Sequence, residues 1–512
     1  MKTSRRRLDV NVEELDRVID AAENGPLSNA DRQKLKTTLH ALVERLAPKR
    51  NTEKTNSVLE PKNPSSTTTE SPDPAAPAGH GRNAASAFTG AEKVSVQHAH
   101  LKPGDPCPEC REGKVYRQKE PKTLIRIVGQ APLRATVFEM ERLRCNGCCQ
   151  MFTAAEPAGV GTAKYDTTAV AMIALLKYGT GMPFNRMERL ETQLGVPLPA
   201  ATQWELMEAA AGSLEPILEE LIRQAAQGSV VHNDDTGMRI LKLARNTEDG
   251  RTGTFTSGIV SIWRECRIAL YFTGWKHAGE NLADVLKRRT AELDAPIQMC
   301  DALSRNTPKL PGVEVLLANC LAHGRRQVVD VAANFPEECR YVLETLGKVY
   351  LTDAQARERQ LSPESRLLFH QEHSAPLMDE MHQWMESQFA EHKTEPNSGL
   401  GKAISYLQRH WTKLTLFLRQ SGAPLDNNIA ERALKKAILH RKNALFYKTK
   451  NGARVGDLFM SLIHTCELNK ANPFDYLTEL LRHPAEMKAH PAEWMPWNYR
   501  ETLTRIATPA AA

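Results

Sequence analysis

The chain has 512 residues, of which 41% are hydrophobic and 25% charged, and this composition is that of an ordinary globular protein rather than a disordered or fibrous one. Its formal net charge of +6 permits a polyanionic partner without requiring one. No apolar run reaches the roughly 18 residues of a membrane-spanning helix, and the amino terminus has no apolar signal-peptide core, so a cytoplasmic protein with several domains is expected.

Residues 1–47 are predicted to be helical, because apolar residues recur at helical spacing at Leu35, Leu39, Leu42, Val43 and Leu46. A small helical hairpin and a coiled-coil or partner-binding helix both fit this short pattern. Residues 48–97 are rich in Ser, Thr, Pro, Ala and Gly and have almost no large apolar residues, which predicts a flexible linker.

Residues 98–155 contain two Cys-x2-Cys pairs, in CPEC and CNGCC, separated by 34 residues. Two such turns can present four thiolates to one tetrahedral ion, which predicts a zinc ribbon; a redox pair or unliganded thiols is the alternative. Four thiolates leave no open coordination position, so this Zn²⁺ is expected to be structural. The predicted ligands are Cys107, Cys110, Cys145 and Cys148, with Cys149 as the alternative to Cys148.

Residues 160–226 are predicted to form helices interrupted by the segment LGVPLP, with a second helix from Ala200. Helix, turn and helix suit a helix-turn-helix DNA reader, and they suit plain helical packing equally well. The start of the second helix, AATQWELMEAAAG, carries no Lys or Arg, which weakens the DNA-reading interpretation.

From residue 227 to residue 334 the pattern predicts three strands, a helix, two further strands and a helix, which is a mixed α/β layer. Residues 335–420 are rich in Glu, Gln, Arg, Leu and His and are predicted to be a helical insertion. The α/β unit is expected to resume over residues 421–480, and residues 481–512 are taken as a carboxyl-terminal tail.

Three carboxylates stand at the ends of these predicted elements. Asp234 follows the first strand, Asp301 ends the fourth, and Glu431 precedes a run from Arg432 to Arg454 with eight Lys or Arg residues and no acid. Each alone has an ordinary explanation, as a turn residue or, for Glu431, as a capping box with Asn428. Three carboxylates brought together would need divalent cations, and oxygen ligands suit two Mg²⁺ or Mn²⁺ ions that catalyse phosphoryl transfer. The strand order is that of a ribonuclease-H-like domain, so the expected fold is multidomain α+β with such a catalytic domain.

Several longer motifs extend this interpretation, and they lie in one order along the chain: LRCNGC, KYGTGMPFNRMERLETQLGVPLPAATQWEL, HNDDTG, CLAHGRR, LDNNIAERALK, RKNALF and SLIHTCELNKANPFDYL. In these the sequence resembles bacterial transposases of the insertion sequence 66 family, from the cysteine region to about residue 480. The resemblance implies a D-D-E catalytic triad of Asp234, Asp301 and Glu431, and a helical insertion before the glutamate. The family usually has Asp-Glu-Thr where this chain has Asp-Asp-Thr, and Asp235 is the alternative first ligand.

Basic residues near these carboxylates are expected to contact DNA phosphates, with surface or capping roles as the alternative. On an ideal helix Lys435 lies about 40° around from Glu431, where it can pair with that carboxylate or touch the scissile strand. The predicted DNA-binding residues are His323, Arg325, Arg326, Lys435, Arg441, Lys442 and Asn443.

The resemblance implies a polynucleotidyl transferase that cuts the ends of an insertion sequence and joins the exposed 3′-hydroxyl to target DNA. It also implies a homo-oligomer on double-stranded DNA, companion proteins of the same element and a bacterial, nucleoid-associated location. The zinc ribbon and residues 160–226 would bind the terminal repeats. Two alternatives remain open: a nuclease of the same fold that cuts without joining, and a DNA-binding regulator with an inactive catalytic domain.

Overall fold

The structure is a computed structural model that describes residues 85–507, apart from residues 89, 119–121, 147, 149, 162, 244–250 and 310–313. The helical region predicted at 1–47 and most of the predicted linker lie outside the described residues. The described residues form two compact units; one holds those up to Cys320 together with those from Ala423 onward, and the other holds Leu321–Gly422. No helix within the described part of the chain is long and apolar enough to cross a membrane.

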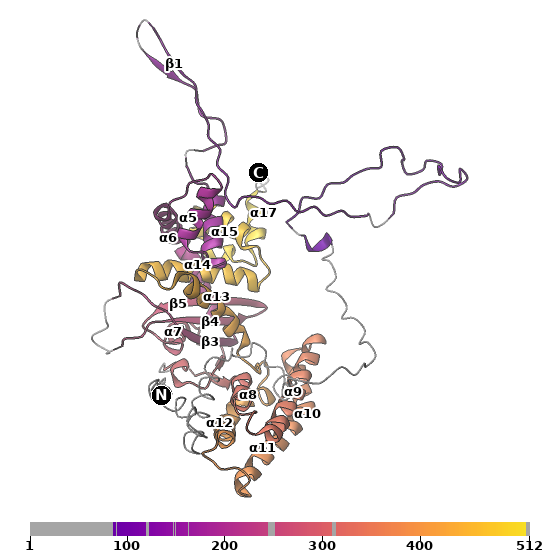
Figure 1. Ribbon diagram of the computed structural model, residues 1–512, viewed down its shortest axis with the longest axis vertical. Helices are drawn as coiled ribbons and strands as arrows, with labels where there is room; N and C mark the ends of the chain where they lie inside the picture. The colour runs from indigo at the N-terminus through magenta and orange to yellow at the C-terminus, as the bar shows by residue number, and fades with distance from the viewer. Residues whose placement is uncertain are drawn as a thin grey trace, which may run out of the picture. The chain divides into compact units, whose positions relative to one another are not determined.

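The first unit is built on a five-stranded mixed sheet in the order β5-β4-β3-β6-β7, of which β5, β4 and β3 are labelled side by side in Figure 1. β3 pairs antiparallel with β4 and parallel with β6, so the carboxyl ends of β3, β6 and β7 meet at one edge. β3 is buried over its first four residues, as the apolar run before Asp234 predicts. The five strands predicted from the sequence are confirmed at β3 (Val230–Gly237), β4 (Phe255–Trp263), β5 (Cys266–Gly274), β6 (Ile297–Cys300) and β7 (Leu316–Asn319).

Helices cover both faces of this sheet. On β4, Ser257 accepts a hydrogen bond from Asn281 of one helix, α7, while the Cα of Gly258 faces Leu434 of another, α13. Because adjacent strand residues point to opposite faces, α7 and α13 lie on opposite sides of the sheet. The helices and helical turns of this unit include α4 (Thr167–Ala174), η2 (Leu175–Gly179), α5 (Phe184–Gln193), α6 (Ala200–Ala225), α7 (Ala278–Leu286), η3 (Ser304–Asn306), α13 (Asn428–Ala444), α14 (Lys450–Leu468), α15 (Pro473–Arg482), α16 (Pro484–Ala489), η5 (Pro491–Trp494) and α17 (Tyr499–Ala507).

The open edge of β5 is closed by α14 rather than by a sixth strand. The backbone amides of Ala269, Tyr271 and Thr273 donate to side chains of α14 at 3.1, 3.0 and 2.7 Å. These acceptors, Thr465, Ser461 and Asp457, are spaced four residues apart, so they form one stripe on the helix. The stripe satisfies backbone groups that an exposed edge strand would offer to other chains.

Residues 160–226 fold as the helices α4, α5 and α6, and the predicted break separates α5 from α6. One face of α6 is buried along its length, through Met207, Ala211, Leu214, Ile217 and Leu221. A DNA-reading helix would also bury one face against its own domain, so the helix-turn-helix interpretation stays a prediction beside plain helical packing.

The segment after residue 480, taken from the sequence as a tail, is folded. It forms α16, η5 and α17, and Trp494, Met495 and Tyr499 are buried in the main core. The Tyr476 hydroxyl donates to the backbone oxygen of Trp494 at 2.7 Å, so this segment is tied to α15.

The second unit is helical. It contains α8 (Leu321–Val329), α9 (Pro336–Glu358), α10 (Pro363–His373), α11 (Ala375–Ala390), α12 (Gly399–Leu414) and the short turn η4 (Leu416–Leu418). The carboxylate of Asp353, buried on α9, contacts Arg357, Arg366 and His370 and so joins α9 to α10. The unit begins at Leu321, ahead of the predicted start at residue 335, because α8 packs on α9 and α12.

Candidate active site

The two aspartates of β3 point to opposite faces of the sheet. Asp235 is on the side of α7, where its carboxylate meets His277 Nδ1 at 2.7 Å and Arg305 at 3.3 Å. Asp234 is on the side of α13, between His232 and Thr236 along the strand. With Asp235 already held by two basic side chains, Asp234 is the better placed of the pair to face a ligand.

Asp234 and Asp301 are brought together by one amide. The Nδ2 of Asn306 donates to Asp301 Oδ1 at 2.6 Å and to Asp234 Oδ1 at 3.3 Å. Burial raises the pKa of Asp234 to about 7, and repulsion from Asp301 and Asp235 adds to this against the opposing hydrogen bonds of the Asp235 amide and Asn306. Two such carboxylates repel each other when ionised, so this corner of the sheet favours a cation.

A buried amide network holds Asn306 in place. The backbone oxygen of Asn306 accepts from Asn233 Nδ2 on β3 and from Gln298 Nε2 on β6, both at 2.7 Å. Gln298 Nε2 also donates to Asn233 Oδ1 at 2.8 Å, and all three side chains are fully buried. The network fixes the turn η3 against two strands, so the Asn306 side chain is aimed at the carboxylates by the core.

Glu431 lies in the first turn of α13, and Asn427 anchors that end of the helix. The Asn427 side chain donates to the Asn233 backbone oxygen at 3.0 Å, and its Oδ1 lies 3.2 Å from His232 Nδ1. The backbone amide of Asn427 donates to Cys320 Sγ at 3.2 Å. The predicted capping box is therefore wrong: the helix is preceded by Asn427, not Asn428, and the Asn427 side chain bonds to β3 instead of capping.

The third carboxylate, Glu431, lies beside the end of β7. A carboxylate oxygen of Glu431 lies within 4.8 Å of Cys320 Sγ, just past the end of β7. Across the described residues, Asp234, Asp301 and Glu431 do not form one group at that spacing. The structure thus joins Asp234 to Asp301 through the Asn306 amide, and places Glu431 on α13, which covers the same face of the sheet as Asp234.

The residues predicted to bind DNA fall into three sets. Arg441 donates to Thr236 Oγ1 at 3.0 Å and to the Gly237 backbone oxygen, and Asn443 donates to the Gly181 backbone oxygen at 3.2 Å. These two side chains hold α13 to its neighbours, whereas Lys435 and Lys442 are exposed. His323, Arg325 and Arg326 lie on α8 in the helical unit.

The predicted zinc ligands lie in two tight turns. Cys145 and Cys148 fall between β1 (Arg142–Arg144) and β2 (Met151–Thr153), where the Cys145 amide donates to the Gln150 oxygen at 2.9 Å. The Cys107 amide donates to the Gly113 oxygen at 2.7 Å, and hydrogen bonds from this turn and from Cys107 lower the pKa of the Cys110 thiol. Among the described residues, the sulfur atoms of these four cysteines do not form a group whose members all lie within 4.8 Å of one another.

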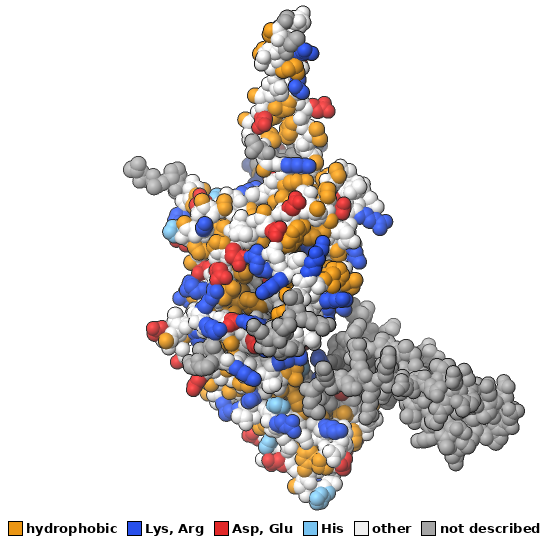
Figure 2. All heavy atoms as spheres, turned by 90° about the vertical axis from the view of Figure 1, so that its left-hand side faces the viewer, with side chains coloured by type: hydrophobic (Ala, Val, Ile, Leu, Met, Phe, Trp, Pro, Cys, Tyr) orange, Lys and Arg blue, Asp and Glu red, His pale blue; other side chains and the backbone are white. Residues whose placement is uncertain are grey.

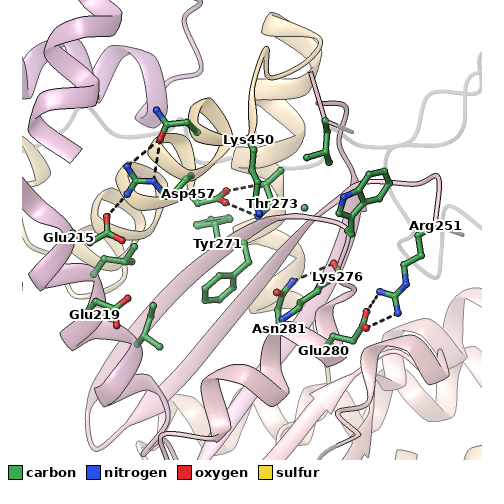
Figure 3. Close-up of a pocket in the computed structure, with 18 residues that line it drawn as sticks. Glu215, Glu219, Arg251, Tyr271, Thr273, Lys276, Glu280, Asn281, Lys450 and Asp457 are labelled. Atoms are coloured by element: carbon green, nitrogen blue, oxygen red, sulfur yellow. Dashed lines mark hydrogen bonds and ion pairs between the residues drawn. The ribbon is translucent and has the colours of Figure 1, made fainter. Parts of the chain in front are cut away.

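On the face shown in Figure 2, Lys and Arg side chains are interspersed with Asp, Glu and hydrophobic ones. A pocket of about 730 Å³ lies beside the end of β5, and both of its arginines are in ion pairs with glutamates that also line it (Figure 3). Arg251 pairs with Glu280 at 2.8 Å, and Arg454 pairs with Glu215 at 2.5 Å. These pairings leave the pocket poorly suited to a phosphate, so the carboxylate corner is the stronger site.

Comparison with known proteins identifies the family to which this part of the chain belongs. The model of the family described as "Transposase IS66 family" matches residues 163–455, which includes both strands of the carboxylate corner and α13. The chain belongs to the IS66 family of transposases. A transposase-type function follows from this membership. Two relatives from Sinorhizobium fredii are similar over most of this family member: "Uncharacterized protein y4hP", 24% identical over 82% of this chain and 78% of its own length, and "Uncharacterized protein y4jD", 26% identical over 76% and 78%.

Sequence reasoning missed the residues that support the carboxylates in this IS66-family chain. Asn306 stands five residues after Asp301 in a short polar turn, and Gln298 is a polar residue inside an otherwise apolar strand. A buried-strand glutamine was the available signal, since a buried amide needs partners. His277 had no comparable signal before its contact with Asp235 was seen.

Proposed function

We propose that this chain is a D-D-E DNA transposase whose ribonuclease-H-like domain uses Asp234, Asp301 and Glu431 as catalytic carboxylates. The observation that supports this most is the pair Asp234 and Asp301, held by Asn306 at the carboxyl edge of a mixed sheet. The raised pKa of Asp234 adds to the argument, because a bound cation would relieve that repulsion.

The donor set suits Mg²⁺ or Mn²⁺, which prefer carboxylate oxygens, and Asp234, Asp301 and Glu431 would hold them. When bound, two such ions supply Lewis-acid stabilisation of the attacking and leaving oxygens of a phosphodiester. The chain itself fixes the carboxylates: Asn306 orients the two aspartates, and Asn427 sets the position from which Glu431 is presented.

The DNA would be held by exposed cations of α13, chiefly Lys435 and Lys442, with His323, Arg325 and Arg326 of α8 as further phosphate contacts. Arg441 and Asn443 serve this binding indirectly, because they tie α13 to β3 and to Gly181. The two cysteine turns would bind structural Zn²⁺ and help contact the element ends. A homo-oligomer on double-stranded DNA, companion proteins of the same element and a cytoplasmic location complete the proposal.

The test is strand transfer from precut element-end duplexes into plasmid DNA with Mg²⁺ or Mn²⁺. Asp234→Asn, Asp301→Asn and Glu431→Gln are each expected to lose on the order of a thousandfold in rate, since a bound ion contributes several kcal/mol. Glu292→Gln, which removes an exposed carboxylate elsewhere in the unit, is the matched control and should retain the rate.

Three other outcomes would redirect the proposal. Cleavage of element ends without joining would identify a nuclease, and specific DNA binding without either reaction would identify a regulator. Unchanged strand transfer in the Glu431→Gln variant would remove Glu431 from the triad.

A further inference from the structure

The turn that follows α13 has an unusual backbone. Leu445 has φ 69° and ψ −39°, and the Phe446 amide donates to the Ala444 oxygen at 2.8 Å, two residues back. This is a γ-turn with positive φ at its centre, a conformation that is rare and strained for a residue with a branched side chain. Strained residues of this kind concentrate at functional sites, which directs attention to what the turn presents.

The turn presents two apolar side chains to solvent. Leu445 is 65% exposed and Phe446 is 37% exposed, and we call this pair the apolar tip. Two adjacent apolar side chains are thus exposed at the position of the strained turn, where a partner can reach them.

The residue after the apolar tip is firmly anchored. Tyr447 is buried, its amide donates to the Arg239 oxygen at 2.8 Å, and its oxygen accepts from the Leu241 amide at 2.9 Å. Its ring stacks on His440 with centroids 4.4 Å apart. The apolar tip is therefore carried on a rigid base between α13 and the chain that follows β3.

The surroundings of the apolar tip are cationic. Lys442 lies about one helical turn before the apolar tip, and Lys448 follows Tyr447. The backbone oxygen of Lys448 accepts from the backbone amide of Lys242 at 2.9 Å. These three lysines and Arg239 are exposed, and the two segments that supply them, residues 238–243 and 432–454, contain no Asp or Glu.

We propose that the apolar tip is a wedge that enters a base step of duplex DNA while the surrounding cations hold the adjacent phosphates. This rests on the proposed function for the identity of the partner and adds a way of deforming it. Apolar side chains that unstack a base step, flanked by basic residues on the backbone, are a known route to bending DNA. A protein partner would be expected to bring acids to the same cations, whereas a duplex brings phosphates on both sides of an apolar stack.

The experiment compares binding of two duplexes of equal length by the full chain, one fully paired and one with a single mismatch beside 2-aminopurine. A mismatch weakens stacking in advance, so the wild-type chain is expected to bind that duplex about tenfold more tightly and to raise the 2-aminopurine fluorescence. Leu445→Gly and Phe446→Ala are expected to lose both the preference and the fluorescence rise while still binding the paired duplex. Leu445→Gly is informative because glycine relieves the positive φ, so its melting temperature should not fall.

Two controls separate the wedge from simple binding. Leu351→Ala removes a leucine that is 59% exposed on α9 and should keep the preference. Lys442→Ala should weaken binding of both duplexes equally and reduce its salt dependence.

The wedge is overturned if Leu445→Gly keeps the mismatch preference, or if the variant changes the oligomeric state of the chain or its binding to anionic vesicles instead. Unstacking is measured by duplex binding and by 2-aminopurine fluorescence, and neither measurement requires catalysis. A chain that unstacks DNA but does not transfer strands would refute the proposed function alone, and one that transfers strands without unstacking would refute the wedge alone.

Discussion

Replacing Asp457 by Asn should stabilise the folded chain, and more so at high pH. Asp457 is buried on α14 and accepts from the Thr273 amide at 2.7 Å and hydroxyl at 2.6 Å. Burial raises its pKa to about 7 from an ordinary value of 3.8. The folded chain therefore binds this proton more tightly than the unfolded chain, so the stability it contributes is complete below pH 4 and is lost as pH rises to about 7.

The size of the effect follows from those two pKa values. Relative to a carboxyl that stays protonated in both states, the difference in pKa lowers the free energy of unfolding by at most about 4 kcal/mol at pH 8. At pH 5 the same difference lowers it by roughly 1 to 2 kcal/mol. An asparagine keeps an acceptor for the Thr273 amide and can donate to its hydroxyl, whose proton can then turn to Thr256 Oγ1, 2.8 Å away. The Asn variant should gain about 2 to 3 kcal/mol relative to wild type between pH 5 and pH 8.

Guanidinium unfolding at both pH values measures this difference, with Asp475→Asn as the control because Asp475 is an exposed carboxylate on α15. The reasoning fails if Asp457→Asn shifts the free energy of unfolding equally at pH 5 and pH 8. It also fails if the variant is destabilised at pH 8, since that would mean the ionised carboxylate is the better acceptor for the β5 edge.

Further predictions address the site and its supports. Asn306→Ala should lower strand transfer by about ten- to hundredfold and weaken Mn²⁺ binding measured by titration, because it frees the two aspartates to separate. Arg441→Ala should reduce the free energy of unfolding by about 1 to 3 kcal/mol in thermal melts, as it detaches α13 from the end of β3, whereas Lys442→Ala should leave melting unchanged and weaken DNA binding. Cys107→Ser should abolish the zinc content measured by elemental analysis and Cys266→Ser should preserve it; equal zinc in both would remove the predicted four-cysteine site.

The strands and the positions of the aspartates could be predicted because their signals are local. Apolar runs bounded by polar breaks marked β3 to β7, and Asp234 and Asp301 stood where two of these runs end. The parallel pairing of β3 and β6 then brought the two aspartates to one edge, as strand order alone requires. The separation of Asp234 from Asp235 followed in the same way from strand alternation.

The rest depended on contacts between residues far apart in sequence. Asn427 looked like an ordinary residue before a helix, and only the folded chain shows its side chain bonded to β3, 194 residues away. For the same reason Arg441 was predicted to touch DNA, since the sequence shows its charge but not the Thr236 hydroxyl that it meets. The arrangement of buried amides around Asn306 follows from tertiary packing, which short-range patterns do not encode.

The hydrogen bond from the Asn427 amide to Cys320 Sγ has a consequence for how such a chain can diversify. Cys320 is the last residue of the first part of the sheet-bearing unit, and Asn427 lies near the start of its second part. The hydrogen bond joins these two residues at 3.2 Å although they are 107 residues apart in sequence. When the two ends of an intervening segment meet this closely, its length and contents can change without altering the framework that receives them. The segment between them is thus a module that can be lengthened, shortened or exchanged, while the asparagine and cysteine at its ends keep Glu431 in register with the strands.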